Sequence, residues 1–294
     1  MINLRWARPD ERSPVQQYLF EKMGKIPFDK WANILDCRWN KKNDQYGVVV
    51  EENGELAGFL GIVFADRDID DQSHRTGNIT SWYIAKHLRR GGLGQDMLEL
   101  ITQDENVTYV ATSANFRSGA LLKKIGWQVM EEQRLFWQRL PTPTRPTQEL
   151  ITGQKHVLYY AFEQGDLSSN ASQIIRAHEG LNITHHLLTQ DMKPPLFFCT
   201  YEKRKGPESV QSFEILYAEN RQGIGQNIQT IADLLLPNDQ AVLSSDSRFV
   251  EGGVAHSKIV DLEVPRFFKP TKNLSASQIS FIFSEVLLLD LKVY

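Results

Sequence analysis

The spacing of hydrophobic residues changes between residues 81 and 101. Trp82 and Ile84 belong to an apolar run that is typical of a strand. The apolar residues that follow recur at the i, i+4, i+7 and i+8 positions of one helix face: Leu93, Met97, Leu100 and Ile101. The pattern therefore predicts a strand that leads directly into a helix.

Three glycines occupy the junction between this strand and this helix: Gly91, Gly92 and Gly94. Glycine leaves the backbone N–H groups open to a ligand, and the positive end of the helix dipole lies behind them. Cationic side chains crowd the approach: Lys86, His87, Arg89 and Arg90. The residues favour a phosphate-binding turn, and the alternative is a glycine-rich connection among solvated charges.

The absence of two sequence signatures disfavours two classes of phosphate ligand. The sequence has no Gly-Lys-Ser/Thr triplet of a nucleoside triphosphate loop, and Met97 stands where a dinucleotide fingerprint requires glycine. The pattern that fits is R-x-x-G-x-G, formed by Arg89, Gly92 and Gly94. This arrangement resembles the coenzyme A pyrophosphate loop of the GNAT N-acyltransferase superfamily.

The following segment matches that superfamily as well. A short strand is predicted over residues 109–112, and Asn115 then leads a helix that Gly126 ends as a C-cap. The apolar side of this helix is expected to contain Phe116, Ala120, Leu121 and Ile125. The spacing from Asn115 to Gly126 is that of the superfamily.

Upstream, the sequence predicts an opening strand and helix, and a hairpin about Asn53-Gly54. The resemblance covers roughly residues 2–138. It implies an α/β fold of the α+β type, in which helices flank a central mixed, mostly antiparallel sheet.

The length of the chain and a proline-rich segment indicate two domains. A chain of 294 residues is long enough for two, and Pro141, Pro143 and Pro146 stand among threonines after the first unit. We therefore expect an acyl-CoA-binding GNAT domain over 1–140, a linker over 141–148, and a second GNAT-like domain over 149–294.

The second domain repeats the glycine motif 131 positions later. Four of its residues align with Arg90, Gly92, Gly94 and Gln95: Arg221, Gly223, Gly225 and Gln226. The helix periodicity is repeated too, which favours an internal duplication over a chance glycine turn. Because Asn220 replaces the cation Arg89 and Asp246 or a neighbour replaces Asn115, we expect only the first domain to bind acyl-CoA. The second domain would help to form the acceptor pocket.

Composition limits the partners. A net charge of −3 and a pI near 6.2 disfavour a nucleic-acid or membrane-surface partner. Cys37 and Cys199 are too few for a disulfide framework, and without a CxxC motif no zinc site is expected. The sequence shows neither a signal peptide nor a long apolar span, so a cytoplasmic protein is expected.

The resemblance also implies the site. The acyl donor would be acetyl-CoA or another short acyl-CoA, with no metal, and the backbone N–H of Ile84 would stabilise the oxyanion. The implied cofactor-binding residues are Tyr83, Ile84, Arg89, Arg90, Gly91, Gly92, Leu93, Gly94 and Asn115.

Proton transfer is less defined by the sequence. The acceptor ammonium must lose a proton before attack, and the acidic segment 66–75 offers Asp70 and His74 as candidate bases, although a solvated charged loop is the favoured alternative. Many GNAT enzymes carry a tyrosine on the helix after Asn that protonates the leaving thiolate. This chain has Leu122 there.

The acceptor is inferred from the layout. Two tandem units are similar to the tandem GNAT sugar N-acyltransferases of bacterial surface-polysaccharide pathways. That similarity implies the amino group of a dTDP- or UDP-linked amino deoxy sugar as acceptor. A peptide, protein or aminoglycoside-like amine is one alternative, and a catalytically inactive CoA-binding module is another. A homo-oligomer is compatible with the resemblance, although no residues mark an interface.

Overall fold

The computed structural model describes residues 1–40, 42–69, 72–141, 147–164, 167–190, 193–271 and 274–291. The chain forms two compact units. The first contains Met1–Met130, Val264–Ile279 and Phe283–Leu291, and the second contains Glu131–Glu263 and Ser280–Ile282.

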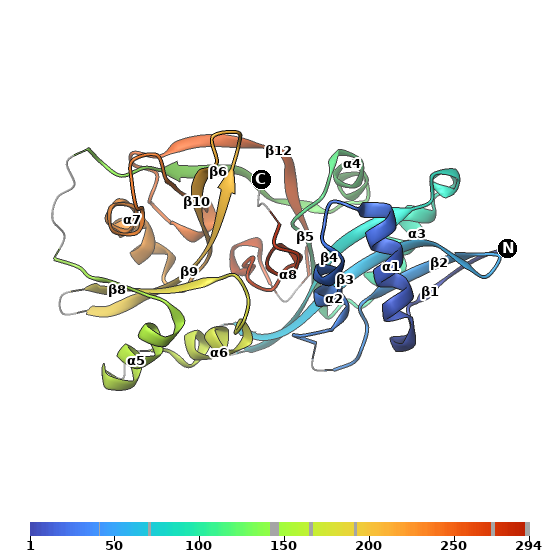
Figure 1. The fold of residues 1–294 in the computed structure, drawn as a ribbon, viewed down its shortest axis with the longest axis horizontal. Coiled ribbons are helices and arrows are strands. Elements are labelled where there is room, and N and C mark those ends of the chain that lie inside the picture. Colours follow the sequence, from blue (N-terminus) through green and yellow to red (C-terminus); the bar gives the residue numbers. More distant parts are fainter. Residues whose placement is uncertain are drawn as a thin grey trace. The chain divides into compact units, whose positions relative to one another are not determined.

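The first unit has the element order that the sequence predicts (Figure 1). Its elements up to residue 124 are β1 (Ile2–Trp6), α1 (Arg12–Met23), α2 (Phe28–Leu35), β2 (Gly47–Glu52), β3 (Glu55–Ile69), β4 (Gln72–Ile84), α3 (Leu93–Ile101), β5 (Val107–Ala111) and α4 (Phe116–Lys124). Short 3-10 turns precede α1 and α3. Helices α1 and α2 lie in front of the strands in Figure 1.

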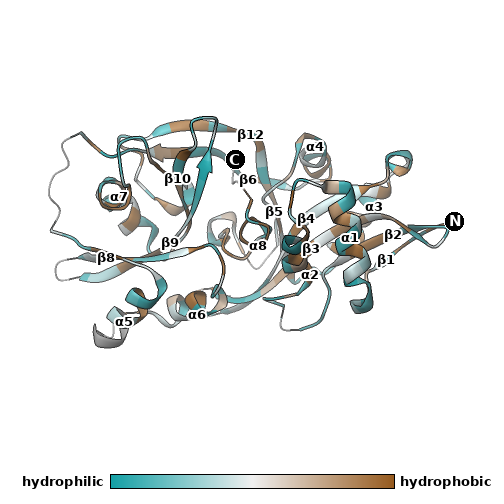
Figure 2. Cartoon of the chain, viewed as in Figure 1, coloured by the Kyte–Doolittle hydropathy of each residue, from teal (hydrophilic) through white to brown (hydrophobic). Residues whose placement is uncertain are grey.

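The sheet of the first unit is mixed and mostly antiparallel, as expected. Strands β1 to β4 are antiparallel neighbours, and β4 and β5 run parallel on either side of the α3 crossover. β2 is drawn largely in hydrophobic colours in Figure 2, in agreement with its buried valines. The β2–β3 turn has Asn53 at φ 52° and Gly54 at φ 86°, the left-handed conformations that an Asn-Gly hairpin requires.

The charged segment 66–75 is not the solvated loop that the sequence favoured. β3 and β4 continue through it as paired strands, with Asp66 opposite Arg75 in the register. The two side chains form an ion pair at 2.8 Å that is largely buried. Alternating charged residues therefore lie on the faces of a long two-stranded ribbon.

β4 and β5 separate before β4 ends. They pair from Arg75 to Asn78 of β4, but β4 continues to Ile84. The β3–β4 register also shifts here, because two steps along β3 (Gly61 to Phe59) match three along β4. Ser81 has φ 52° in this β-bulge. Within the described residues, the two features leave one edge of residues 81–84 without a neighbouring strand.

Helices α3 and α4 cover a hydrophobic core on one face of this sheet. Met97, Leu98 and Ile101 of α3 are buried there, together with Leu122 of α4 and Trp127. Two expectations were wrong: Phe116 is 65% exposed, and Ala120 is exposed as well. These residues lie four positions apart on one side of α4, whereas the side that packs on the sheet buries Gly119 and Leu122.

From β7 to β11, the second unit repeats the order of the elements from β1 to β5. Its elements are β6 (Gln128–Trp137), β7 (Leu150–Thr152), α5 (Gln154–Gln164), α6 (Ser169–Ala177), β8 (Thr184–Gln190), β9 (Lys193–Lys205), β10 (Val210–Ala218), α7 (Arg221–Leu235) and β11 (Val242–Asp246). β10 and β11 are parallel around α7, as β4 and β5 are around α3. The repeat therefore extends to topology, in support of a tandem layout.

The last strand of each copy lies in the other unit. β6 ends the first copy, yet its residues Arg134–Trp137 lie in the second unit and pair with β11. β12 (Lys258–Lys269) ends the second copy, yet Phe267–Lys269 pair with β5. The units thus divide at residue 130, whereas the sequence placed a linker at 141–148. Of that segment, 142–146 lie outside the described residues.

The C-terminal part of the first unit contains α8 (Glu285–Leu288). The backbone N–H of Glu285 donates to Asn78 Oδ1 at 3.0 Å, where β4 leaves β5. Among the described residues, none of the helices combines the length and the apolar character that a membrane span requires. Cys37 and Cys199 are free thiols.

Candidate active site

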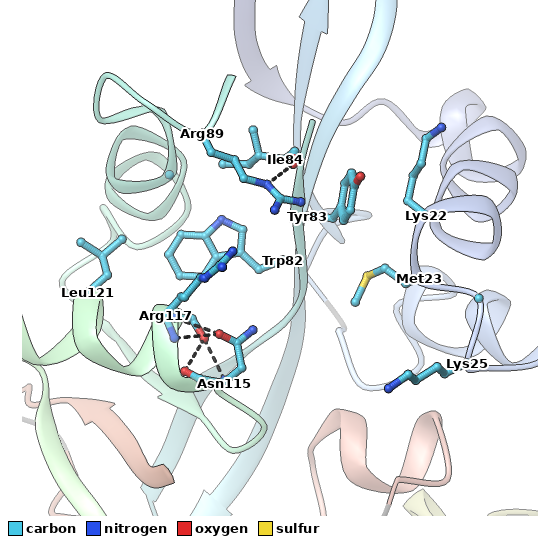
Figure 3. A pocket seen from close by; sticks show the side chains of 13 residues that line it. Lys22, Met23, Lys25, Trp82, Tyr83, Ile84, Arg89, Asn115, Arg117 and Leu121 are labelled. Atoms are coloured by element: carbon cyan, nitrogen blue, oxygen red, sulfur yellow. Dashed lines mark hydrogen bonds between the residues drawn. The ribbon is translucent and has the colours of Figure 1, made fainter. Parts of the chain in front are cut away.

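A cavity of about 680 Å³ opens at the separated edge of β4 in the first unit (Figure 3). Its lining comes from the end of α1, the end of β4, α3 and α4. The lining residues are Lys22, Met23, Gly24, Lys25, Trp82, Tyr83, Ile84, Arg89, Gly94, Asn115, Arg117, Ser118 and Leu121. This volume is within the usual range for a small-molecule site.

The backbone of Ile84 faces away from β3. Ala85 N–H donates to Ala57 O of β3 at 2.8 Å, and alternate residues of an antiparallel strand direct their N–H and C=O groups to opposite sides. The polar groups of Ile84 therefore point toward the side on which β5 has separated. Arg89 Nε donates to Ile84 O at 2.8 Å, while the N–H of Ile84 is directed to the same side.

The N-terminus of α3 has no side-chain cap. Gly92 is its N-cap residue, and Gly91 and Gly92 have φ values of 92° and 90°, a conformation that glycine tolerates best. A Cβ atom at either position would meet no atom within 4 Å. Gly91 and Gly92 thus border open space, and Gly94 in the first turn of α3 lines the cavity, as suits an anion-binding helix terminus.

Asn115 positions the start of α4 beside this terminus. Its Oδ1 accepts hydrogen bonds from the backbone N–H groups of Arg117 and Ser118, at 2.9 and 3.1 Å. Ser118 Oγ in turn accepts from Asn115 N–H at 2.9 Å, which completes a capping box. Because Oδ1 is used in the cap, the amide group of Asn115 can offer its Nδ2 donor to a ligand.

The two sides of β4 contribute different side chains to the cavity lining. Figure 3 shows Trp82, Arg117 and Leu121 on one side of the strand, and Tyr83 with Lys22, Met23 and Lys25 on the other. Lys22 and Lys25 belong to the end of α1 and the turn after it. Within the described residues, no aspartate or glutamate lines either side of the cavity.

Known proteins with this geometry identify the fold. The acetyltransferase (GNAT) family matches residues 4–127, which include α3, α4 and the separated strands. Residues 4–127 therefore form a GNAT domain. The match supports an acyltransferase that transfers an acyl group from coenzyme A to an amine.

Solved structures extend the likeness to the second unit. A GCN5-related N-acetyltransferase from Anabaena variabilis is 12% identical with a TM-score of 0.57, over 91% of this chain and 72% of that one. A tandem GNAT protein from the clavulanic acid biosynthesis pathway is 13% identical with a TM-score of 0.53, over 92% and 100%. At these identities the likeness is one of fold. None of the curated proteins matches the chain in sequence.

The structure brings five of the nine predicted cofactor residues to the cavity at the separated edge of β4. They are Tyr83, Ile84, Arg89, Gly94 and Asn115. The other four, Arg90, Gly91, Gly92 and Leu93, form the segment that leads into α3. The role of each residue remains a prediction.

The two candidate bases are not brought to this cavity. Asp70 lies outside the described residues. His74 is on β4, opposite Arg67 of β3, and ten residues before Ile84. At roughly 3.3 Å per strand residue this is about 30 Å away. The described part of the chain also contains no group of three or more His, Cys, Asp or Glu that could hold a metal ion.

The position assigned to a GNAT tyrosine does not face the cavity. Leu122 is 1% exposed and belongs to the hydrophobic core. The α4 residues that do line the cavity are Asn115's neighbours Arg117 and Ser118, followed by Leu121 one turn later. Among the described lining residues, the side-chain hydroxyl groups are those of Tyr83 and Ser118.

The equivalent helix terminus in the second unit is closed. α7 begins at Arg221, and its N-cap Asn220 accepts from Gly223 N–H at 2.8 Å. A Cβ at Gly225 would collide with the backbone carbonyl of Glu251. The repeated glycines therefore permit close packing of α7.

The separated edge in the second unit is filled as well. β10 has its own register shift beside Leu216, and Leu216 O accepts from Phe281 N–H at 3.1 Å. Phe281 is completely buried. Asp246, like Asn115, caps the turn after the parallel strand, and burial raises its pKa. These contacts support acyl-CoA binding in the first unit alone.

Sequence reasoning missed the α1 side of the site. Lys22, Met23 and Lys25 carry no motif, and only tertiary structure brings the end of α1 to β4. Trp82 and Arg117 adjoin residues that the motif did select. His185 and His186 on β8 are both buried, and burial lowers their pKa values to about 4 and about 3.

Proposed function

We propose that this protein is an acyl-CoA-dependent N-acyltransferase whose acceptor amine belongs to an anionic molecule, namely a dTDP- or UDP-linked amino deoxy sugar. The observation that supports this acceptor class is the pair Lys22 and Lys25 on the α1 side of the cavity. These two cations lie across β4 from the α3 terminus, so they are additional to the charges that coenzyme A needs.

Acyl-CoA would bind along the separated edge of β4. The uncapped N-terminus of α3 and the guanidinium group of Arg89 suit the pyrophosphate. The backbone N–H of Ile84 would donate to the thioester oxygen, and more strongly when that oxygen becomes an oxyanion. The acyl group is expected to be acetyl or another short chain.

The reaction is a direct transfer. The neutral amine nitrogen attacks the thioester carbonyl, a tetrahedral intermediate forms, and the C–S bond then breaks to give an amide and the coenzyme A thiolate. The amine nitrogen loses a proton and the thiolate gains one. Because no carboxylate or imidazole lines the cavity among the described residues, we propose that water carries the proton from the amine.

The candidate acceptors differ in charge, and Lys22 and Lys25 would distinguish between them. An aminoglycoside carries several positive charges, which Lys22 and Lys25 would repel, whereas the diphosphate of a nucleotide sugar would be attracted. A peptide amine has no fixed charge that these lysines would select. The anionic acceptor is therefore favoured over both alternatives.

An acceptor screen tests the proposal. With acetyl-CoA as donor, release of free thiol would be measured for a dTDP-amino sugar, a UDP-amino sugar, the free amino sugars, an aminoglycoside and a peptide. We expect turnover of the nucleotide-linked sugars, with kcat/KM at least about tenfold above that of the free sugar. Turnover restricted to peptide or aminoglycoside amines would reject the anionic acceptor, and acetyl-CoA binding without any turnover would favour the inactive CoA-binding module.

Charge reversal then locates the acceptor. Lys22→Glu and Lys25→Glu should each raise KM for the nucleotide sugar by roughly tenfold or more, since a lost charge-assisted hydrogen bond costs about 1.5–3 kcal/mol. The Kd for acetyl-CoA should change little. Lys123→Glu is the matched control, because Lys123 is exposed on α4 and does not line the cavity. Equal effects of all three variants would indicate a general effect of net charge.

A further inference from the structure

The second unit contains its own cavity, of about 690 Å³, formed by residues of that unit alone. Its lining residues are Phe136, Gln138, Arg139, Leu140, Lys205, Gly206, Val210, Ser212, Gln229, Val242, His256, Lys258 and Val260. Val210 begins β10 and Val242 begins β11. The cavity therefore lies at the starting ends of these parallel strands, opposite to the end where Asn220 caps α7, and is not a remnant of the duplicated acyl-CoA site.

The charge of this cavity is positive. Arg139, Lys205, His256 and Lys258 line it, and within the described residues no aspartate or glutamate does. Lys205 is already paired with the buried Glu214. Arg139 and Lys258 have no ion-pair partner in the described part of the chain. Two cations are thus available to an anion.

The rest of the lining combines apolar side chains with three polar ones, Gln138, Ser212 and Gln229. Phe136, Leu140, Val210, Val242 and Val260 supply aromatic and aliphatic surface. An anion without an apolar body would leave this surface without a partner, so inorganic phosphate alone does not match the cavity. The lining fits a molecule that is anionic at one end and apolar at the other.

Gln229 requires a hydrogen-bond donor from the ligand. Its Nε2 donates to Gln138 O at 2.9 Å and to Asp233 Oδ1 at 3.0 Å, which fixes the orientation of the amide. Its Oε1 is buried and has no hydrogen-bond partner among the described residues. A buried acceptor without a donor is unfavourable. A ligand that supplies an N–H group from its apolar part would satisfy it.

We infer that this cavity binds a nucleoside phosphate. The phosphate would pair with Arg139 and Lys258, the base would lie against Phe136 and the neighbouring aliphatic side chains, and a base N–H would donate to Gln229 Oε1. A fatty acid has the anionic and apolar parts but no donor on its chain. The site is separate from the acyl-CoA cavity of the first unit, and the inference does not depend on the proposed acceptor.

The test is a calorimetric titration of UMP, dTMP, AMP and GMP into the full-length protein, with acetyl-CoA kept at saturation so that the first unit is occupied. We expect one site per chain for at least one nucleotide, and binding of inorganic phosphate at least about tenfold weaker. The double variant Arg139→Ser/Lys258→Ser should weaken nucleotide binding by 100-fold or more. Gln229→Leu should weaken it several-fold while phosphate binding stays unchanged.

Lys22→Glu is the matched control for the first unit, and it should leave this nucleotide site intact. The inference is overturned if none of the four nucleotides binds in the millimolar range, or if acetyl-CoA displaces the nucleotide. It is also overturned if the double variant, shown by circular dichroism to be folded, binds as the parent does. A nucleotide bound at the acceptor side of the first unit would be lost in Lys22→Glu and retained in the double variant, so the two sites, and the failure of either proposal, are distinguished.

Discussion

The Thr112 hydroxyl donates to the buried carboxyl group of Glu285, with Thr112 Oγ1 2.9 Å from each carboxyl oxygen. Thr112 follows β5, whereas Glu285 begins α8, 173 residues later. Asn78 Nδ2 also donates to Thr112 Oγ1, at 3.2 Å. The C-terminal segment is thus hydrogen-bonded to the two strands at the point where they separate.

Burial of Glu285 predicts a pH-dependent stability. Burial raises the pKa of this carboxyl group, so the folded protein holds the proton at pH values where the unfolded chain has lost it. The stabilising contribution is present below the unfolded pKa and is lost as pH rises through the folded pKa. We therefore expect Glu285→Gln to match the parent near pH 4.5 and to exceed it at pH 8, measured by urea unfolding.

Glu285→Ala separates this charge effect from packing. The alanine leaves a cavity and removes the partner of Thr112, so it should be less stable than Glu285→Gln at both pH values. If Glu285→Gln instead lost stability only at pH 8, the result would show that the Glu285 carboxylate is ionised in the folded protein and stabilises it.

Gly92→Glu should weaken acetyl-CoA binding by at least about 100-fold, because the side chain and its negative charge would enter the space before α3. Binding is measured by calorimetry, which also gives the number of sites per chain, expected to be one. Two equivalent sites would contradict the closure of the second unit by Asn220 and Phe281.

Gly54→Glu is the matched control for Gly92→Glu. Gly54 has φ 86° and open surroundings, so the backbone strain is similar, but it lies in the β2–β3 turn. Gly223, the duplicate of Gly92, would be a poor control, since a Cβ there would lie 2.6 Å from Leu196 Cδ2. If Gly54→Glu weakened binding as much as Gly92→Glu, general destabilisation would explain the result.

Tyr18→Phe should stabilise the free protein by about 1 kcal/mol. The Tyr18 hydroxyl is buried without a hydrogen-bond partner among the described residues, and burial raises its pKa to about 12. Removing an unsatisfied buried hydroxyl relieves its desolvation cost. Tyr46→Phe is the control, because the Tyr46 hydroxyl donates to Arg8 O at 2.7 Å and its loss should cost about 1 kcal/mol. A similar loss in both variants, measured by urea unfolding, would show that the Tyr18 hydroxyl is paired.

The pH dependence of kcat/KM should depend on the pKa of the acceptor amine. If water accepts the proton, the rate rises with pH until the acceptor amine itself is neutral, and nearby Lys22 and Lys25 lower the pKa of that amine. Acceptors whose amines differ by one pKa unit should shift the acidic limb by about one unit. An acidic limb at the same pH for every acceptor would instead indicate a base on the enzyme.

Local patterns predicted the centre of the first unit well. The change of hydrophobic period at residue 85, the glycines after it and the Asn115 cap are all determined by neighbouring residues, and they specified β4, α3, β5 and α4. The duplication was visible for the same reason, because α7 keeps the helix face of α3.

Non-local structure could not be predicted from these patterns. Nothing near Phe267 indicates that it pairs with Ala111, and nothing near Lys22 indicates that it borders Tyr83. The charged segment 66–75 forms paired strands, in which Asp66 lies opposite Arg75. Each of these features depends on partners that are distant in the sequence or on the opposite strand.

The pairing of Phe267–Lys269 with β5 also affects how the protein is made. During translation, the first unit emerges from the ribosome long before its last strand exists, so the edge of β5 stays open while some 150 further residues are added. An open strand edge is a template for pairing with other chains. The nascent protein is therefore most prone to aggregate in this interval, and shielding of the β5 edge by a chaperone would matter more than the stability of the finished fold.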